Sequence, residues 1–535
     1  MSSPVHVITY DLGTTGVKTC LYLITDKITL LESSYEGYNL YILDNGGAEQ
    51  DPGEWWKALC KTTKDILKKT SLLKEDIKAV SFCSQMQCLV LSDKEGKPVR
   101  RAMSYMDNRA QQLFAKGPNP LNLLLWLFIT KAAPVSAKDP IWKYKWVEKY
   151  EPEIFARIHK WLDAKDYLSA RLTGRFTMTE GSAFPTFLFD TRKGKHNWSE
   201  KLCKIAGVKK EHLPEIILST DKVGGITAQA AEEIGLAEGT SVYGGGGDAE
   251  LMGIGVGAVE EGSTHIYLGT SGWVSTVTKK QIVDIGASIA SIVGCQPGLF
   301  NYFAEMETAG KCLEWVKDHL ALDEIGIYLE KKNVTESAES VYKNLFDYLC
   351  ETVNMVPAGS GGVIFTPWLH GNRCPFEDSG ARGIFFNISL NTGKSALIRS
   401  VIEGIAFHCK FMLEAQKHKL KPSEIISVCG GGALSPVICQ LLSDITGHKT
   451  AVLPNPQNAG ALGAAVLIAK ALGRISSIES AKKLLPDYRI FHPNSEYKQI
   501  YDRNFLVFKT LYKDNKKSFA IMNTLNNSIP KLSDR

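Results

Sequence analysis

Two short apolar runs lie near the N-terminus, and a polar turn separates them. The stretch from residue 8 to residue 23 reads ITYDLGTTGVKTCLYL, and its flanks, residues 8–10 and 19–23, are rich in aliphatic, aromatic and β-branched residues, as strands are. Gly13 and Gly16 permit a tight hairpin and let a ligand approach the backbone closely. The pattern predicts a strand, a hairpin turn and a second strand.

The polar groups of this turn suit phosphate oxygens. Thr14 and Thr15 add hydroxyls to the exposed backbone N–H groups, and Lys18 adds a positive charge. Asp11 fits this chemistry only if a metal ion lies between its carboxylate and the phosphate, because two anions repel each other. The alternative is an ordinary polar turn in which Asp11 bonds to the local backbone.

The same turn recurs about half a chain later. Residues 12–16 read LGTTG and residues 268–272 read LGTSG, and each copy lies between two strand-like runs. We infer two similarly built domains that each contribute a hairpin of hydroxyls and glycines, so that the two hairpins grip a polyphosphate from both sides. Chance recurrence of a common turn is the alternative.

Two further glycine runs each join a predicted strand to a predicted helix. In SVYGGGGDAELMGIGVGAV, Asp248 starts an apolar segment, and capping a helix is its structural alternative. In IISVCGGGALSPVICQLLSDITG, residues 425–429 read as a strand, and the apolar spacing predicts an amphipathic helix that ends at Gly447. A strand, a glycine turn and a helix N-terminus form a site for an anion or a nucleotide. Neither run spells a P-loop or a dinucleotide-binding fingerprint.

Composition narrows the class of protein. The chain has 535 residues, of which 44% are hydrophobic and 22% charged, and this length predicts two or more domains. A net charge of +5 is too small and too dispersed to indicate a nucleic-acid partner. The 12 cysteines form no C-x-x-C pair, so neither a zinc site nor a disulfide framework is indicated. The most apolar run, residues 123–129, is too short to span a bilayer, and we expect a cytoplasmic protein without a membrane partner.

Seven motifs, in the correct order, resemble those of the FGGY carbohydrate kinases, and within that family the chain is most similar to xylulokinases. The resemblance runs from Asp11 to about Leu472. The motifs are DLGTTGVK, WLDAKDYLSARLTG, GGGGDAELMGIGVG, YLGTSGW, CPFEDSGARGIFFNIS, IRSVIEGIAF and CGGGALSPVICQLLSDITG.

The resemblance implies an α/β fold of two actin-like, hexokinase-type (ribonuclease H-like) domains, with ATP and a sugar in the cleft between them. We place the N-terminal domain at residues 1–256, the C-terminal domain at 257–480 and a C-terminal extension at 481–535. Residues 116–149 and 324–345 read as insertions, and the residues after about 513 read as a frayed polar tail.

Transfer of the γ-phosphoryl group of ATP to a sugar hydroxyl requires phosphate-binding groups, a metal ion and a carboxylate that accepts the hydroxyl proton. We assign Asp11 to Mg²⁺, through water, because one or two carboxylates are enough to hold this ion. The resemblance places the catalytic base at Asp248, and we expect the helix N-terminus to lower the pKa of this carboxyl and keep it ionised. The expected ATP and phosphate contacts are Gly13, Thr14, Thr15, Lys18, Gly269, Thr270, Ser271, Gly310, Gly431, Gly432, Ala433 and Ser435.

Sugar recognition requires paired donors and acceptors beside an apolar wall. Xylulokinase-like sequences commonly carry Met-His in the first sugar motif and Asn after the base, whereas this chain has Gln87 and Ala249 there. The exact sugar therefore stays open. Asp107 either contacts the substrate or forms a local ion pair with Arg109. The expected substrate contacts are Met86, Gln87, Tyr105, Asp107, Asp248 and Ala249.

The sequence thus predicts an ATP-dependent kinase of a small-molecule ketose or polyol, with D-xylulose as the best single guess and ribulose, gluconate, glycerol or erythritol as alternatives. Two other classes share the architecture. Chaperone-like ATPases carry a large peptide-binding domain, which does not follow here, and pseudokinase regulators often lose one carboxylate of the pair that Asp11 and Asp248 represent. A homodimer is left open.

Overall fold

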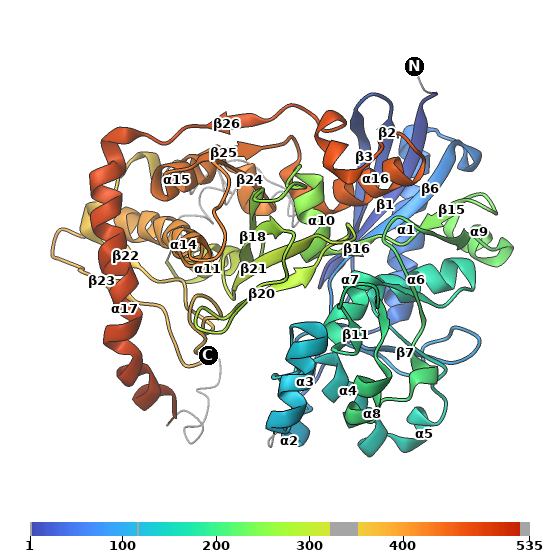
Figure 1. The fold of residues 1–535 in the computed structure, drawn as a ribbon. Coiled ribbons are helices and arrows are strands. Elements are labelled where there is room, and N and C mark those ends of the chain that lie inside the picture. Colours follow the sequence, from blue (N-terminus) through green and yellow to red (C-terminus); the bar gives the residue numbers. More distant parts are fainter. Residues whose placement is uncertain (1–2, 115–116, 321–350, 352, 525–535) are drawn as a thin grey trace.

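The computed structural model describes residues 3–114, 117–320, 351 and 353–524, and it contains two α/β units side by side (Figure 1). The N-terminal sheet has the strand order β14 (Lys222–Gly225), β15 (Ser241–Tyr243), β6 (Ile77–Ser84), β1 (Val5–Leu12), β2 (Gly16–Ile24) and β3 (Ile28–Gly37), with β16 (Gly246–Gly247) beside β6. The C-terminal sheet has the order β19 (Val283–Asp284), β20 (Ile289–Val293), β21 (Phe300–Met306), β18 (Gly272–Thr278), β17 (Thr264–Leu268), β24 (Ile425–Cys429), β25 (Lys449–Val452) and β26 (Arg489–Phe491).

The central strands of the two sheets pair in the same way. β1 pairs antiparallel with β2 and β2 with β3, while β6 lies parallel to β1. In the second sheet β17 pairs antiparallel with β18 and β18 with β21, while β24 lies parallel to β17. The two polar turns found in the sequence are thus the β1–β2 and β17–β18 hairpins. The expected α/β fold of two similarly built domains is confirmed.

Helices cover both faces of the N-terminal sheet, and a group of helices packs on the C-terminal sheet. In the N-terminal unit, α1 (Pro52–Thr70), α6 (Ala164–Thr173) and α9 (Ala228–Ile234) pack on one face, and α10 (Asp248–Gly255) and α16 (Ala459–Ala471) pack on the other. In the C-terminal unit, α14 (Lys394–Lys417), α15 (Pro436–Thr446) and α17 (Lys498–Thr524) pack near one another, and α11 (Gly310–Trp315) contacts α14. The helix predicted to end at Gly447 is α15, which Ser435 caps by accepting the N–H of Ile438.

A separate hydrophobic cluster lies in a lobe of short elements attached to the N-terminal unit. Most of the predicted insertion at 116–149 folds here as α3 (Pro120–Thr130) and α4 (Pro140–Tyr150). Within the described residues, the remaining short strands and α-helices are β4 (Tyr41–Ile42), β5 (Ala48–Gln50), β7 (Val90–Ser92), β8 (Ala102–Met103), α2 (Gln111–Phe114), α5 (Pro152–Phe155), β9 (Lys160–Leu162), β10 (Thr177–Thr179), α7 (Glu180–Ala183), β11 (Phe189–Asp190), β12 (Asn197–Trp198), α8 (Glu200–Ala206), β13 (Glu215–Ile217), β22 (Ile364–Phe365) and β23 (Phe385–Phe386).

Helix α16 comes late in the chain but packs on the N-terminal sheet, and Figure 1 shows it beside β1, β2 and β3. Its apolar residues share one buried cluster with Val7, Tyr22 and Ala79 of that sheet. Helix α10 crosses α16 at two glycines. A Cβ on Gly255 would lie 1.9 Å from the carbonyl oxygen of Ala459, so the backbones of the two helices touch. The predicted boundary near residue 257 stays a prediction.

The predicted polar tail is wrong over much of its length, because α17 continues to Thr524. The ring of Tyr512 stacks on Phe376 with centroids 3.5 Å apart, and the Asn523 side chain donates to the carbonyl of Gly380 at 2.6 Å. Sequence reasoning missed the end of this helix because the residues after 513 are mostly polar and the loop that they contact is far away in the chain. The predicted insertion at 324–345 and the last residues, 525–535, lie outside the described residues.

Candidate active site

The two predicted carboxylates lie where the two units meet. Asp11 is near the end of β1 and faces Lys18 across the hairpin, and Asp248 is the first residue of α10. Glu305 of β21 and Tyr267 of β17 lie close enough for their charges and those of the two aspartates to influence one another. We call this group of four side chains the junction site. Its residues come from both units.

Asp248 has the geometry of a proton acceptor. Its Oδ1 accepts the N–H of Ala249 at 2.7 Å, and its Oδ2 accepts no hydrogen bond from the described residues. Gly247, rather than Asp248, occupies the N-cap of α10, so Asp248 does not have the capping role that was its structural alternative. The Met86 side chain packs over the backbone of Gly247, since a Cβ there would lie 2.3 Å from the Met86 sulfur. The residue before Asp248 thus contacts a predicted sugar residue.

The expected lowering of the Asp248 pKa is wrong. Burial raises the pKa of this carboxyl to about 7, and the negative charges of Asp11, Glu305 and Glu250 add to the rise. The N–H of Ala249 acts in the opposite direction but is outweighed. The helix N-terminus could be read from the sequence, whereas burial and the carboxylate of Glu305 could not.

Asp11 meets the requirements of a metal ligand. Burial raises its pKa, and the positive charge of Lys18 opposes the rise. Its carboxylate and that of Asp248 repel each other, which a divalent cation between them would relieve. Among the described residues no cluster of three or more histidine, cysteine or acidic side chains forms a complete cage. These residues fit an ion held by one or two carboxylates and by water, as Mg²⁺ is.

The first hairpin is braced by residues that sequence reasoning missed. The Tyr38 hydroxyl donates to the carbonyl of Gly13 at 2.6 Å, and the Gln50 amide donates to the carbonyl of Thr14 at 2.6 Å. The hydroxyls of Thr14 and Tyr105 lie 3.2 Å apart, which joins a predicted phosphate contact to a predicted sugar contact. Single polar residues far apart in the chain gave no signal of this bracing.

Lys18 is engaged across the junction between the two units. Its ammonium donates to the carbonyl of Gln457 at 3.0 Å, next to the start of α16. The neighbouring Thr15 carbonyl accepts the N–H of Tyr38 at 3.0 Å. The structure therefore places Lys18 between the first hairpin and the C-terminal part of the chain, beside Asp11.

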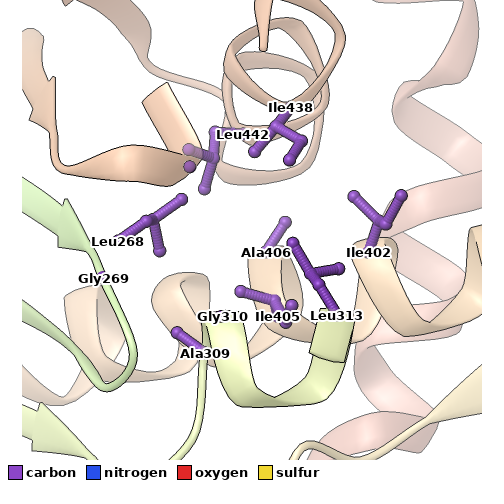
Figure 2. A pocket seen from close by; sticks show the side chains of 11 residues that line it. Leu268, Gly269, Ala309, Gly310, Leu313, Ile402, Ile405, Ala406, Ile438 and Leu442 are labelled. Atoms are coloured by element: carbon purple, nitrogen blue, oxygen red, sulfur yellow. The ribbon is translucent and has the colours of Figure 1, made fainter. Parts of the chain in front are cut away.

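The second hairpin borders an apolar pocket in the C-terminal unit. Figure 2 shows Leu268 and Gly269 on one side, Ile438 and Leu442 of α15 on another, and Ile405 of α14 across the pocket from α15. The pocket is a narrow slot with a cavity volume of only about 20 Å³, inside about 380 Å³ of empty space that includes open solvent. Its apolar walls suit a flat ring such as adenine. Its other lining residues are Ala309, Gly310, Leu313, Ile402, Ala406 and Gly432.

Three predicted nucleotide contacts, Gly269, Gly310 and Gly432, meet in this pocket although they are far apart in the sequence. The N–H of Gly310 donates to the carbonyl of Gly269 at 2.8 Å. The remaining predicted contacts lie close by in the chain: Thr270 and Ser271 form the tip of the β17–β18 hairpin, and Gly431 and Ala433 lie in the 3₁₀ turn before α15. The Ser435 hydroxyl caps α15, as described above.

The residues predicted to contact the sugar differ in their exposure and in their hydrogen bonds. Gln87 is partly exposed and has φ +65°, a left-handed conformation that is uncommon for a residue with a side chain. Tyr105 is exposed, and Ala249 is buried. Asp107 is fully buried, and its carboxylate accepts the guanidinium of Arg109 at 2.7 Å and the N–H of Ala48 at 2.9 Å. These contacts are those of the ion pair that was its alternative role.

Sequence reasoning also missed the aromatic residues of the junction. The ring of Tyr267 stacks on Trp273 with centroids 3.9 Å apart, and the Trp273 indole donates to His265 at 3.1 Å. The YLGTSGW motif contains Tyr267 and Trp273, so a closer reading of the residues that flank the glycines would have found them.

Arg373 is a further residue of the junction that sequence reasoning missed. It forms ion pairs with Glu305 at 2.5 Å and with Glu307 at 3.1 Å.

Comparison with known proteins identifies both halves of the chain. The N-terminal domain model of the FGGY family of carbohydrate kinases matches residues 6–255, and the C-terminal domain model matches residues 265–472. A xylulose kinase of Lactococcus lactis subsp. lactis (strain IL1403) is 31% identical over 516 residues, which are 95% of this chain and 97% of that protein.

Two solved structures are similar over nearly the whole chain. The ligand-bound xylulose kinase from Lactobacillus acidophilus has a TM-score of 0.82 at 25% identity and covers 97% of this chain and 99% of its own. The gluconate kinase from the same organism has the same TM-score and identity and covers 97% and 100%. The resemblance to xylulokinases is confirmed. The chain belongs to the FGGY family of carbohydrate kinases and is a phosphotransferase with an alcohol group as acceptor.

Proposed function

We propose that the chain transfers the γ-phosphoryl group of ATP to a hydroxyl of a neutral ketose or polyol, with D-xylulose and its 5-phosphate as the first candidate pair. The observation that carries the proposal is Asp248 at the junction site: its Oδ2 accepts no hydrogen bond from the described residues, its neighbour Gly247 contacts Met86, and its charge interacts with that of Asp11. A sugar hydroxyl at this oxygen would give up its proton to the carboxylate as the oxygen attacks the phosphoryl group.

The other residues of the site would bind and orient ATP, the metal ion and the sugar. The backbone and hydroxyls of the two hairpins would hold the phosphates, and the pocket beside Gly432 would take the adenine. Asp11 would hold Mg²⁺ through water. When bound, this ion screens the charge of the phosphates during transfer. Asp107 supports the sugar side from behind, through Arg109 and the Ala48 N–H.

A neutral substrate is favoured over gluconate. Asp11 and Glu305 already raise the pKa of Asp248 through their negative charge, so the junction repels a further anion. Gln87 and Ala249 stand where xylulokinase-like sequences commonly have His and Asn, and the loss of the Asn removes a donor and an acceptor beside the base. The side chain of Glu250 does not replace them, because it is buried and accepts the thiol of Cys295 at 2.9 Å.

We expect D-xylulose to be the preferred substrate in a panel with D-ribulose, glycerol, erythritol and gluconate. Its kcat/KM should exceed those of the others by at least about tenfold, which corresponds to about 1.4 kcal/mol. The measurement is ADP release by the wild-type protein with each sugar and without sugar. If gluconate gives the highest kcat/KM, the sugar assignment is wrong while the kinase assignment stands. ADP release that no sugar stimulates would contradict the kinase proposal itself.

Asp11→Asn should raise the Mg²⁺ concentration required for half-maximal activity by at least about tenfold, because a neutral amide replaces the carboxylate that attracts the ion. The KM for the sugar should change much less. Activity is titrated against Mg²⁺ at saturating sugar and nucleotide. An unchanged half-saturation would remove Asp11 from the metal site.

A further inference from the structure

Lys143 is fully buried behind the predicted sugar residues. It lies on α4, and its ammonium donates to the carbonyl of Gln87 at 3.0 Å and to the carbonyl of Ser104 at 2.6 Å. Gln87 belongs to the loop after β6, and Ser104 begins the turn that carries Tyr105 and Asp107. One side chain therefore joins the two loops that present the predicted sugar contacts.

Asp163 holds the same residue from the other side. Its Oδ2 accepts the N–H of Gln87 at 3.0 Å, and its Oδ1 accepts the N–H of Cys88 at 3.0 Å and of Ala164 at 2.8 Å. The N–H of Gln87 is thus held by Asp163, and its carbonyl by Lys143. Both held groups belong to a residue in the left-handed region, with φ +65°.

Burying the charged ammonium of Lys143 costs more free energy than is needed to give the two carbonyl groups hydrogen-bond donors. Burial lowers the pKa of Lys143 to about 8, which reflects the cost of keeping an ammonium away from water. Asp107, Asp139 and Asp163 offset part of that cost through their negative charge. Water or a neutral donor would satisfy two carbonyls without a buried charge. A charge-assisted bond is stronger and shorter, and it holds a strained backbone more firmly.

We propose that Lys143 and Asp163 form a clamp that positions the side chain of Gln87 against the turn at residues 104–107, and that this spacing determines which sugar the site accepts. The proposal rests on the proposed function, since it concerns the sugar that the kinase takes. Lys143 and Asp163 are positioning residues. They act through Gln87 and Tyr105, the predicted substrate contacts, and not by contact with the sugar.

The test is Lys143→Met, which keeps the length of the side chain and removes both hydrogen bonds. We expect the KM for the preferred sugar to rise at least about tenfold, while kcat at saturating sugar falls by less than about threefold. The preference for that sugar over the second in the panel should shrink to less than about threefold. The Kd for ATP without sugar, measured by calorimetry, should stay within about twofold of wild type.

Lys165→Met is the matched control. Lys165 is also a fully buried lysine of this unit, but its ammonium bonds to Asp166 at 2.5 Å and to the hydroxyl of Thr179 at 2.9 Å. It donates to neither Gln87 nor Ser104, and it acts on Asp163 through its charge alone. Its loss should lower stability and leave the ranking of sugars unchanged. This pair of variants separates loss of a buried charge from loss of the clamp.

Asp163→Asn supplies the same test if Lys143→Met does not fold, because an amide oxygen can replace only one of the two accepting oxygens. A folded variant of either kind that keeps the wild-type KM and the wild-type ranking of sugars overturns the clamp and leaves the proposed function intact. A wild-type protein that phosphorylates no sugar of the panel overturns the proposed function and the clamp with it.

Discussion

Asp248→Asn should lower kcat by about 10²–10⁴-fold, or roughly 3–5 kcal/mol of activation free energy, while the protein still folds and binds ATP. The amide keeps the shape of the side chain and can still accept the N–H of Ala249, but it cannot take up the proton of the sugar hydroxyl. The measurement is steady-state ADP release at saturating sugar, together with ATP binding by calorimetry. A variant that retains more than about a tenth of the wild-type kcat would show that another group is the base.

Glu250→Gln is the matched control for this experiment. Glu250 lies two residues further along α10 and also has a pKa raised to about 7, mainly by burial. Its carboxylate accepts the thiol of Cys295 and lies against the backbone of Gly181, so it influences Asp248 through its charge and not through a hydrogen bond. We therefore expect kcat to change by less than about threefold. A loss as large as that of Asp248→Asn would point to a general sensitivity of α10 and not to a base at its first residue.

Gly463→Ala should destabilise the protein by about 3 kcal/mol or more, although alanine is the better helix former by about 1 kcal/mol. A Cβ at this position would lie 2.2 Å from the carbonyl oxygen of Leu251, and backbone cannot move aside as a flexible side chain can. The helices α10 and α16 would have to separate, which would also displace Asp248. The measurement is the midpoint of urea unfolding.

Gly393→Ala is the control for the substitution itself. Gly393 has φ −85° at the N-cap of α14, and a Cβ there would meet no atom within 4 Å. Replacing it with alanine should lower the free energy of unfolding by about 1 kcal/mol or less. Equal effects of the two variants would mean that the close crossing of α10 and α16 does not limit stability.

The parts of the fold that were predicted correctly are those that short stretches of sequence encode. The strand at residues 425–429 and the helix that ends before Gly447 were predicted as they occur, because a serine cap, a proline in the first turn and a C-terminal glycine are all encoded within a few residues. The two hairpins were found in the same way, since their glycines and hydroxyls recur as one motif. The central strands of the sheets then followed from the pairing of those hairpins.

Features that depend on distant contacts were not predictable. The pKa of Asp248 is raised by burial and by the charge of Glu305, which is more than 50 residues away in the sequence. The helical tail is stabilised by contacts such as that of Tyr512 with Phe376. Lys143 belongs to no motif, and the motif that contains Asp163 gave no sign of its role, because what makes both residues notable is the backbone of Gln87 that they hold.

The position of α16 has a consequence for synthesis of the chain. When the first 256 residues have left the ribosome, every strand of the N-terminal sheet has been made. The helix that covers one of its faces, and the residues up to Leu485 that complete the same buried cluster, have not. Until then Val7 and Tyr22 have no apolar cover from α16, and such a face invites aggregation or chaperone binding. The N-terminal unit is translated first, but its hydrophobic core is completed only after α16 has been made. The two units therefore complete their folding together.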